Sequence, residues 1–277
     1  MNEILDRAVR KAVDNFPFPH YMTKDDKPRE VYYSIGRTVM RHMAQGVRIL
    51  DFGCGPCDKT AVLQFLGYTC TGYDDLQDHW HMLPGNREKI VSFASRCGID
   101  LVVAAGGGLP FRSESFDMIL LQDVLEHWHD SPRDLLNDLL QLAKPGGYLL
   151  ITVPNAVNIR KRTRVVLGKS NLPPFDQFYW WPSRWRGHVR EYVRDDLVKL
   201  GGYLDLEIVE LRGCDHMLEK VPPRLKPIYV AVTNVFDGLK DSWLLVARKP
   251  SGWKPIRTLP PDKLNSIAHL WNHDGAH

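Results

Sequence analysis

The stretch VRILDFGCGPCDKTAVLQFLGYTCTGYDD, residues 47–75, decides the fold. It opens with a short apolar run from Val47 to Phe52, turns at glycines, and continues as a helix expected over 59–66. A second β-rich run follows over 68–73. A strand, a glycine turn, a helix and another strand in this order are typical of a parallel α/β unit.

The same alternation continues along the chain. Further apolar runs predict strands over 101–104, 118–121 and 148–153. They lack polar–apolar alternation, as expected for parallel strands covered on both faces. Between the last two, Ser131 fits an N-cap and Pro132 the first helical turn. We therefore predict an α/β fold: an open, doubly wound, mostly parallel sheet with ligands outside the carboxyl ends of its strands.

Four segments of the chain differ in pattern. Residues 1–46 indicate an N-terminal helical extension or cap, and 47–250 form the main domain. Within it, residues 156–187 are basic and then aromatic, which predicts an insertion lying over the ligand edge of the sheet. Residues 251–277 are polar and proline-containing, and a partly disordered tail is expected there.

Composition bounds the class of protein. The formal net charge of +3 over 277 residues is too small to indicate nucleic acid as the main partner. The five cysteines show no disulfide framework. No run of apolar residues approaches the roughly 18 needed for a membrane span, and the N-terminus lacks the apolar core of a signal peptide. We expect a cytoplasmic protein with no membrane span.

The glycine turn is the strongest local signal. Gly53 and Gly55 let the backbone pass close to a ligand, and the next helix offers its first N–H groups. A dinucleotide-binding dehydrogenase is the competing interpretation, but its fingerprint needs a third glycine where Asp58 stands. Asp51, just before the turn, repels a pyrophosphate and suits a cationic amino-acid ligand. The pattern therefore indicates a cofactor other than NAD.

Asp74 ends the following strand about 20 residues beyond the glycines, the spacing of a carboxylate that binds ribose hydroxyls. A carboxylate in this position accepts two O–H donors. The alternative interpretation is an acid that caps the strand or the next helix.

Four segments together resemble the class I methyltransferases, in particular the small-molecule branch related to quinone-biosynthesis enzymes. They are ILDFGCG, GYDD, LPFRSESFDMILLQDVLEH and LLNDLLQLAKPGGYLLITVPN, and they cover about 47–155 in the family's order.

The resemblance implies a seven-stranded, Rossmann-like sheet with N-terminal helices and a lid insertion, and S-adenosylmethionine as cofactor. It places Asp51, Gly53, Cys54 and Gly55 around the amino-acid and sulfonium portion, Asp74 on the ribose, Gly106 near adenine and Gln122 near the transferable methyl. Two positions depart from the family pattern. Cys57 stands where glycine is frequent, which predicts an altered loop. Ala105 replaces an acid that contacts adenine, so backbone groups around Gly106 are expected to hold the base.

Methyl transfer from a sulfonium is an in-line displacement in which the enzyme aligns the acceptor and, for a hydroxyl, removes its proton. His127 and His188 are the candidate catalytic bases, since histidine titrates near neutrality. For His127, a structural role at a strand-to-helix corner is the competing interpretation. His188 begins a segment expected to return to the ligand edge.

Asp123, Glu126 and His127 form an acid-x-x-acid-His cluster that, with His188, is similar to a divalent-metal site of related methyltransferases. Such ligands suit Mg²⁺, Mn²⁺ or Zn²⁺. Acids at such a turn commonly cap a helix, so a divalent metal is possible but no metal site is assigned. Cys54 and Cys57 lie inside the cofactor loop, and a zinc or redox role is not expected of them.

The insertion has two interpretations. Its basic run and its aromatics could be a solvated helix and a small satellite core. Alternatively they form a lid whose aromatics offer apolar or sugar-stacking surface while Arg184, Arg186 and Arg190 hold a phosphate or carboxylate. Single-stranded nucleic acid is a weaker option.

We predict methyl transfer to a hydroxyl of a small or medium acceptor of apolar, cyclic or sugar character. An RNA ribose or other nucleic-acid methyltransferase is the first alternative. Base-amine methylation is disfavoured because Gln122-Asp123-Val124-Leu125 replaces the Asn/Asp-Pro-Pro-Tyr/Phe tetrapeptide. A non-catalytic binding protein of the same fold is the second alternative.

Overall fold

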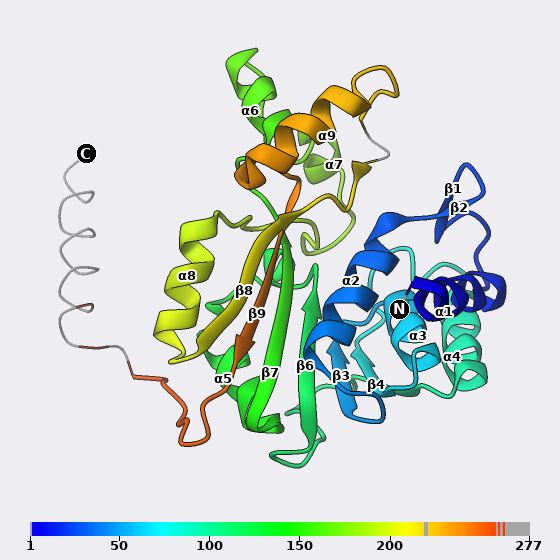
Figure 1. Ribbon diagram of the computed structural model, residues 1–277, viewed down its shortest axis with the longest axis vertical. Coiled ribbons are helices and arrows are strands. Elements are labelled where there is room, and N and C mark those ends of the chain that lie inside the picture. Colours follow the sequence, from blue (N-terminus) through cyan, green and yellow to red (C-terminus); the bar gives the residue numbers. More distant parts are fainter. Residues whose placement is uncertain (1, 219–220, 259, 261–262, 264–277) are drawn as a thin grey trace.

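The computed structural model describes residues 2–218, 221–258, 260 and 263. Its main sheet has seven strands in the order β5-β4-β3-β6-β7-β9-β8 (Figure 1). β9 is antiparallel to both of its neighbours, and the other paired strands are parallel. This confirms the predicted mostly parallel, doubly wound sheet. The strands are β3 (Arg48–Phe52), β4 (Thr69–Asp74), β5 (Asp100–Val103), β6 (Phe116–Gln122), β7 (Ala143–Pro154), β8 (Glu207–Cys214) and β9 (Ser242–Arg248).

Helices cover both faces of the sheet because successive strand residues point to opposite sides. Ile49 and Leu120 lie in one hydrophobic cluster with side chains of α1 (Asn2–Asn15), α2 (Glu30–His42), α3 (Asp58–Phe65) and α4 (Asn86–Cys97). Leu50 and Leu121 lie in the other with side chains of α5 (Pro132–Leu142) and α8 (Arg194–Tyr203). The N-terminal helices thus share a core with the sheet.

Some elements differ from the expected ranges. β6 and β7 each begin earlier than predicted, and the pair contains an irregularity between Phe116 and Met118. The structure adds α4, whose buried Ile90, Phe93, Ala94 and Cys97 follow a helical spacing that the sequence prediction did not include. It also adds a small hairpin of β1 (Thr23–Lys24) and β2 (Lys27–Pro28). The predicted start of α5 is confirmed, since the Ser131 side chain accepts a hydrogen bond from Arg133 N.

The described part of the C-terminal tail is docked on the domain. Trp253 is buried and its Nε1 donates to Leu204 O at 2.7 Å. Ile256 N donates to Asn137 Oδ1 at 2.7 Å. The expected disorder is therefore wrong for 251–258, because an indole and an asparagine anchor that stretch. The rest of the predicted tail (259, 261–262 and 264–277) lies outside the described residues.

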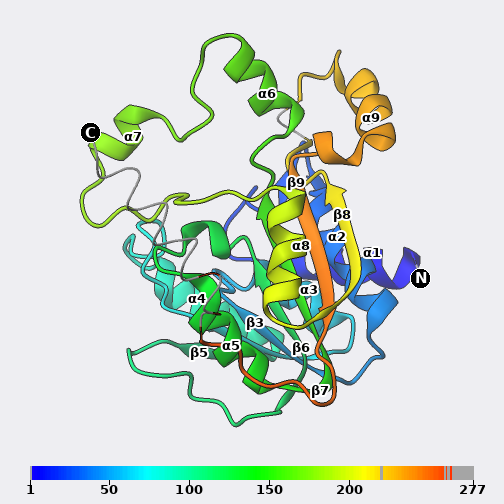
Figure 2. The ribbon, with the colours of Figure 1, turned by 90° about the vertical axis from the view of Figure 1, so that its left-hand side faces the viewer.

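Three helices project beyond the carboxyl end of β7 (Figures 1 and 2). α6 (Ile159–Val166) and α7 (Phe175–Tyr179) belong to the segment after β7. α9 (Lys226–Val235) follows β8, whose carboxyl end lies at the same edge because β8 and β7 are both antiparallel to β9. The insertion therefore lies beyond the carboxyl end of β7, the edge at which the sequence predicts the ligand. In the described part of the chain, no helix is long and apolar enough to cross a membrane.

Candidate active site

The turn after β3 is fixed by its backbone. Gly53 and Gly55 both have positive φ, +71° and +52°, which glycine adopts without strain. Gly53 N donates to Tyr73 O at 2.7 Å. A side chain at Gly53 would place its Cβ 2.5 Å from Val124 Cγ2, so no larger residue fits without displacing that valine.

Asp74 joins this turn to the end of β4. Its carboxylate accepts hydrogen bonds from Gly55 N at 2.8 Å and Leu76 N at 2.7 Å. Burial raises the pKa of Asp74, and these two hydrogen bonds oppose that effect. The acid therefore braces the glycine loop, as the capping interpretation requires. A carboxylate has further lone pairs, so bracing leaves it able to accept ligand hydroxyls.

Asp51 and Gln122 form a buried polar pair at the centre of the sheet edge. Thr60 Oγ1 donates to Asp51 Oδ2 at 2.6 Å, and Gln122 Nε2 donates to Asp51 Oδ1 at 3.3 Å. Burial raises the pKa of Asp51 to about 6. Gln122 Oε1 is buried and has no hydrogen-bond partner among the described residues. An acceptor left unpaired in this way is costly unless a bound molecule donates to it.

Cys57, the residue that departs from the family's glycine, adopts the left-handed conformation with φ of +63°. The loop thus keeps a glycine-like bend despite the side chain. Cys57 Sγ donates to Cys54 Sγ at 3.6 Å, and both thiols are free and buried. This hydrogen bond, followed by burial, raises the pKa of Cys54 well above its usual value, so its thiol is a poor nucleophile.

The loop after β5 leaves room beside Gly106. Ala104 N donates to Asp74 O at 2.8 Å. This bond joins the loop to β4, whose Asp74 is the residue predicted to bind the ribose. A side chain at Gly106 would have no atom within 4 Å of its Cβ. Backbone groups of this loop can therefore be approached by a flat ligand.

Asp123 does not join the predicted acid–histidine cluster. Its backbone is left-handed, with φ of +60°, and its Oδ2 accepts from Lys59 Nζ at 2.6 Å. Although burial opposes the change, Lys59 holds the pKa of Asp123 below its usual value. The prediction that Asp123 is part of one four-residue cluster is wrong, because this backbone turns the carboxylate toward α3.

The other three members of that cluster do meet. Glu126, His127 and His188 each offer a ligand atom, and these atoms lie within 4.8 Å of one another. The two imidazole rings have centroids 4.9 Å apart and cross edge to face. His127 Nδ1 donates to Arg186 O at 2.7 Å, since a carbonyl can only accept. The two predicted bases are therefore brought together.

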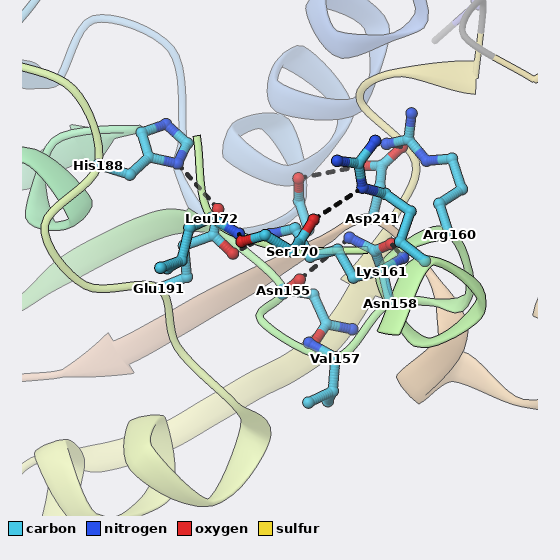
Figure 3. A network of polar contacts seen from close by, with 12 residues as sticks. Asn155, Val157, Asn158, Arg160, Lys161, Ser170, Leu172, His188, Glu191 and Asp241 are labelled. Atoms are coloured by element: carbon cyan, nitrogen blue, oxygen red, sulfur yellow. Dashed lines mark hydrogen bonds and ion pairs between the residues drawn. The ribbon is translucent and has the colours of Figure 1, made fainter. Parts of the chain in front are cut away.

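His188 is oriented by Glu191, a residue outside the predicted site. Its Nδ1 lies 2.9 Å from Glu191 Oε1, and because a carboxylate only accepts, Nδ1 carries the proton and Nε2 the basic lone pair. Lys161 Nζ pairs with the other oxygen of Glu191. Figure 3 shows this network, in which α6 reaches the segment that carries His188. The spacing His188-x-x-Glu191 was the available signal.

Glu126 is the least satisfied group of the site. Its side chain is 1% exposed, and neither carboxylate oxygen has a hydrogen-bond partner among the described residues. Burial, and then the charge of Asp123, raises the pKa of Glu126 well above its usual value. Such a carboxyl is either protonated or compensated by a cation. With two histidines beside it, the donor set fits a divalent metal ion.

The end of the insertion and the residues that follow it are held against the sheet edge by backbone and charge. Val189 N donates to Glu126 O at 2.6 Å. The guanidinium of Arg186 donates to Asp75 at 3.0 Å and to Asp78 at 2.8 Å. Arg186 is therefore already engaged by carboxylates, and the prediction that it helps to hold an anionic acceptor lacks support.

The aromatic run does not form a satellite core. Trp185 contacts Phe178 and Trp181 edge to face, with centroids 5.3 and 5.2 Å apart. None of the predicted six is buried: Phe175, Phe178, Tyr179, Trp180, Trp181 and Trp185. The prediction of a small core is wrong because the rings are too few to enclose one another.

Comparisons with known proteins identify the family of the chain. The model of a methyltransferase-domain family matches residues 1–211. The chain is 28% identical over 169 residues to the ubiquinone biosynthesis O-methyltransferase of Dinoroseobacter shibae, an alignment that covers 61% of this chain and 63% of that protein. The match thus spans less than two thirds of this relative.

Solved structures share the fold. A chain of the Haloferax volcanii complex between the Trm112 methyltransferase activator and a putative methyltransferase has a TM-score of 0.56 at 14% identity, covering 88% of this chain and 98% of that one. A SAM-dependent methyltransferase from Methanosarcina mazei has a TM-score of 0.51 at 16% identity, covering 77% and 97%. With the family match over 1–211, the chain belongs to the class I methyltransferases that use S-adenosylmethionine.

Proposed function

We propose that this methyltransferase acts on a hydroxyl of a small or medium-sized acceptor with apolar, cyclic or sugar character. The observation that carries the proposal is the His188–Glu191 pair beside His127 at the carboxyl edge of the sheet. A histidine whose Nδ1 is fixed by a carboxylate presents Nε2 as a base, which a hydroxyl acceptor needs more than a neutral amine does.

The cofactor residues have separate roles in this proposal. Asp74 accepts the ribose hydroxyls, and backbone groups at Gly106 lie against adenine. The amino-acid portion rests on the turn formed by Gly53, Cys54 and Gly55, above the buried carboxylate of Asp51. Gln122 Oε1, which lacks a partner among the described residues, is positioned to accept a hydrogen bond from the ligand.

When bound, the cofactor supplies a methyl group activated by a positive sulfonium. An acceptor oxygen would bond to that methyl carbon as the carbon–sulfur bond breaks, which would give S-adenosylhomocysteine as the second product. His188 Nε2 takes the hydroxyl proton, and Glu191 stabilises the resulting imidazolium through Nδ1. His127, held by Arg186 O, either orients the acceptor or shares this proton.

An acceptor screen tests the proposal. Phenols, sugars, aliphatic alcohols and amines are incubated with the full chain and S-adenosylmethionine, and S-adenosylhomocysteine release is measured. Turnover on hydroxyl compounds that is lost in His188→Ala supports the proposal. Turnover confined to amines and indifferent to His188 would refute it.

A metal-assisted version is favoured by one observation, the buried and unpartnered Glu126 carboxylate beside two histidines; the absence of a partner refers to the residues that the structure describes. Glu126, His127 and His188 would hold a divalent ion that lowers the pKa of a bound acceptor hydroxyl. Calorimetry with Zn²⁺ and Mn²⁺ on wild type and Glu126→Gln tests it directly. Heat that disappears in the variant supports the metal; no binding in the wild type sets this version aside.

Methylation of RNA ribose is the second candidate, since basic and aromatic side chains are exposed on the insertion. A hydroxyl is again the acceptor, so the same base serves. Adding single-stranded RNA to the screen decides between the two.

A further inference from the structure

The insertion contains helices with no buried face. α6 has eight residues and α7 five, and none of the residues in either helix is buried. Isolated helices shorter than about 12–15 residues are marginal in water, and packing of an apolar face normally stabilises them. Against the rest of the described chain, α6 and α7 therefore have less of the packing that short helices ordinarily need.

Large apolar side chains occupy the outside of these helices and of α9. Val166 is 85% exposed, Trp180 76% and Val235 73%. The other exposed apolar residues here are Val165, Leu167, Leu172, Phe175, Phe178, Tyr179, Leu225, Ile228 and Phe236. Single exposed apolar residues are ordinary on a protein surface, but many on elements that project from the same edge of a sheet mark a binding surface.

The same region is basic. Residues 156–187 contain seven lysines and arginines and one acid, and residues 224–236 contain two basic residues and no acid. The whole chain carries only +3, so the remainder of the chain is net acidic. Positive charge is thus concentrated where the apolar side chains are exposed, and Arg162, Arg164, Lys169, Arg184 and Arg224 are all exposed.

We propose that α6, α7 and α9, hereafter the docking edge, bind peripherally to the surface of an anionic lipid bilayer. Apolar and aromatic side chains enter the headgroup boundary while arginines pair with lipid phosphates and carboxylates. Tryptophan and tyrosine favour this interface because each ring has an apolar body and a polar edge. This binding does not depend on the proposed acceptor or base.

Two other occupants fit the observations less well. A symmetric second copy would set the same basic patch against itself, which repels. Single-stranded nucleic acid would pair with the arginines and stack on the aromatics, but it has no use for exposed Val165, Val166 and Ile228. Bilayer lipid satisfies both the aliphatic and the charged side chains.

The docking edge lies beyond the carboxyl ends of the parallel strands, the edge that also carries the candidate site. Figures 1 and 2 show α6 and α9 projecting together beyond the sheet. Asn155 precedes α6, and its Nδ2 donates to Gly238 O at 2.9 Å, just after α9. The start of α6 and the end of α9 are therefore held together. Lys161 of α6 pairs with Glu191, the residue that orients His188. A bilayer bound here would present an apolar acceptor to the edge that holds His188.

Vesicle flotation of the full chain tests the proposal. The probes are pure phosphatidylcholine vesicles and vesicles in which phosphatidylserine makes up about a third of the lipid. Val166→Glu with Trp180→Glu removes apolar contact, and Arg162→Glu with Arg164→Glu reverses charge. Each pair of substitutions is expected to weaken binding to anionic vesicles at least about tenfold. Each basic residue near such a surface strengthens binding about fivefold, and buried apolar area adds to it. Matched controls are Val91→Glu and Arg87→Glu on α4, both exposed and remote from the docking edge.

The altered residues of α6 and α7 are unburied, so the variants should fold, and unchanged S-adenosylmethionine affinity by calorimetry verifies this. Wild-type binding that requires phosphatidylserine, weakens with salt and is lost in both pairs supports the proposal. Wild-type failure to float overturns it. So do equal binding of controls and variants, tighter binding to single-stranded RNA than to vesicles, or a dimer abolished by Val166→Glu.

Discussion

The turn after β3 and the insertion after β7 serve the same edge of the sheet, but they are constructed in opposite ways. In the turn, a carboxylate braces Gly55 N, and a side chain at Gly53 would strike Val124 at 2.5 Å. In the insertion, α6 and α7 bury none of their residues. The turn is therefore packed into the core, whereas the helices of the insertion lie outside it.

This difference separates two tasks of a transferase. A cofactor common to many methyltransferases can be held by backbone that the core fixes in place. Acceptor recognition varies between relatives, and a segment outside the core can change without loss of the fold. Changes in the turn should therefore alter cofactor affinity. Changes in residues 188–193, which follow the insertion and are hereafter the return segment, should alter turnover.

The largest effect is expected from His188→Ala, which removes the proposed base from the return segment. Turnover on a hydroxyl acceptor should fall by roughly 10²–10⁴-fold, the usual value of general base catalysis, while cofactor affinity changes little. S-adenosylhomocysteine release and calorimetry measure the two quantities separately. Exposed His79→Ala is the control. A parallel loss of cofactor affinity would show that the two regions are not separable.

A second difference is expected between Asp51, a buried acid of β3 just before the turn, and Asp176, an exposed acid of the insertion. Burial raises the pKa of Asp51 to about 6, above its unfolded value, so protonation favours the folded state. Protonated Asp51 stabilises the folded state fully below about pH 4. As the pH rises through about 6, the acid ionises and the free energy of unfolding falls by about 3 kcal/mol. Asp51→Asn should remove that loss.

Urea unfolding of cofactor-free protein at about pH 4 and about pH 7 measures the effect. The free energy of unfolding of the wild type, relative to Asp51→Asn, should fall by about that amount between the two pH values. Exposed Asp176→Asn on α7 should leave the pH dependence as in the wild type. If the free energy of unfolding depended on pH identically in the wild type and in Asp51→Asn, ionisation of Asp51 would not destabilise the folded state.

Asp74→Ala should weaken S-adenosylmethionine binding about 100-fold. It removes hydrogen bonds to a charged acceptor, each worth roughly 1.5–3 kcal/mol, and it releases Gly55 N. Calorimetry measures the affinity. Asp75→Ala, next to it, is the matched control because that carboxylate pairs with Arg186 and does not brace the loop. An unchanged affinity in Asp74→Ala would remove the ribose assignment.

The sequence was informative where local backbone decides the geometry. Gly53, Gly55 and Asp74 belong to two neighbouring strands and one turn, so their spacing determines their positions. It was less informative for Asp123: the spacing to Glu126 and His127 suits a helix, but the chain makes a 3-10 turn at Leu125–His127 and a left-handed residue before it.

Contacts between residues far apart in the chain leave no recognisable pattern in the sequence. Lys59 meets Asp123 only because α3 packs beside the end of β6, and no spacing rule exists for such pairs. Likewise Lys161 of α6 meets Glu191 only because the insertion places that helix beside the segment of His188. Both contacts depend on how elements distant in sequence pack together, which composition and periodicity do not encode.

The smallest expected effect belongs to Glu191→Gln, which keeps the shape of the residue that orients His188 and removes its charge. Turnover should fall about tenfold, because the imidazolium formed during proton transfer loses its stabilising carboxylate. The acidic limb of the pH–rate profile should move to lower pH for the same reason, whereas a purely structural role would leave that limb in place. Asp195→Asn, an exposed acid on α8, is the control. A normal profile in Glu191→Gln would leave His188 without a positioning partner, and the return segment would then contribute only its backbone.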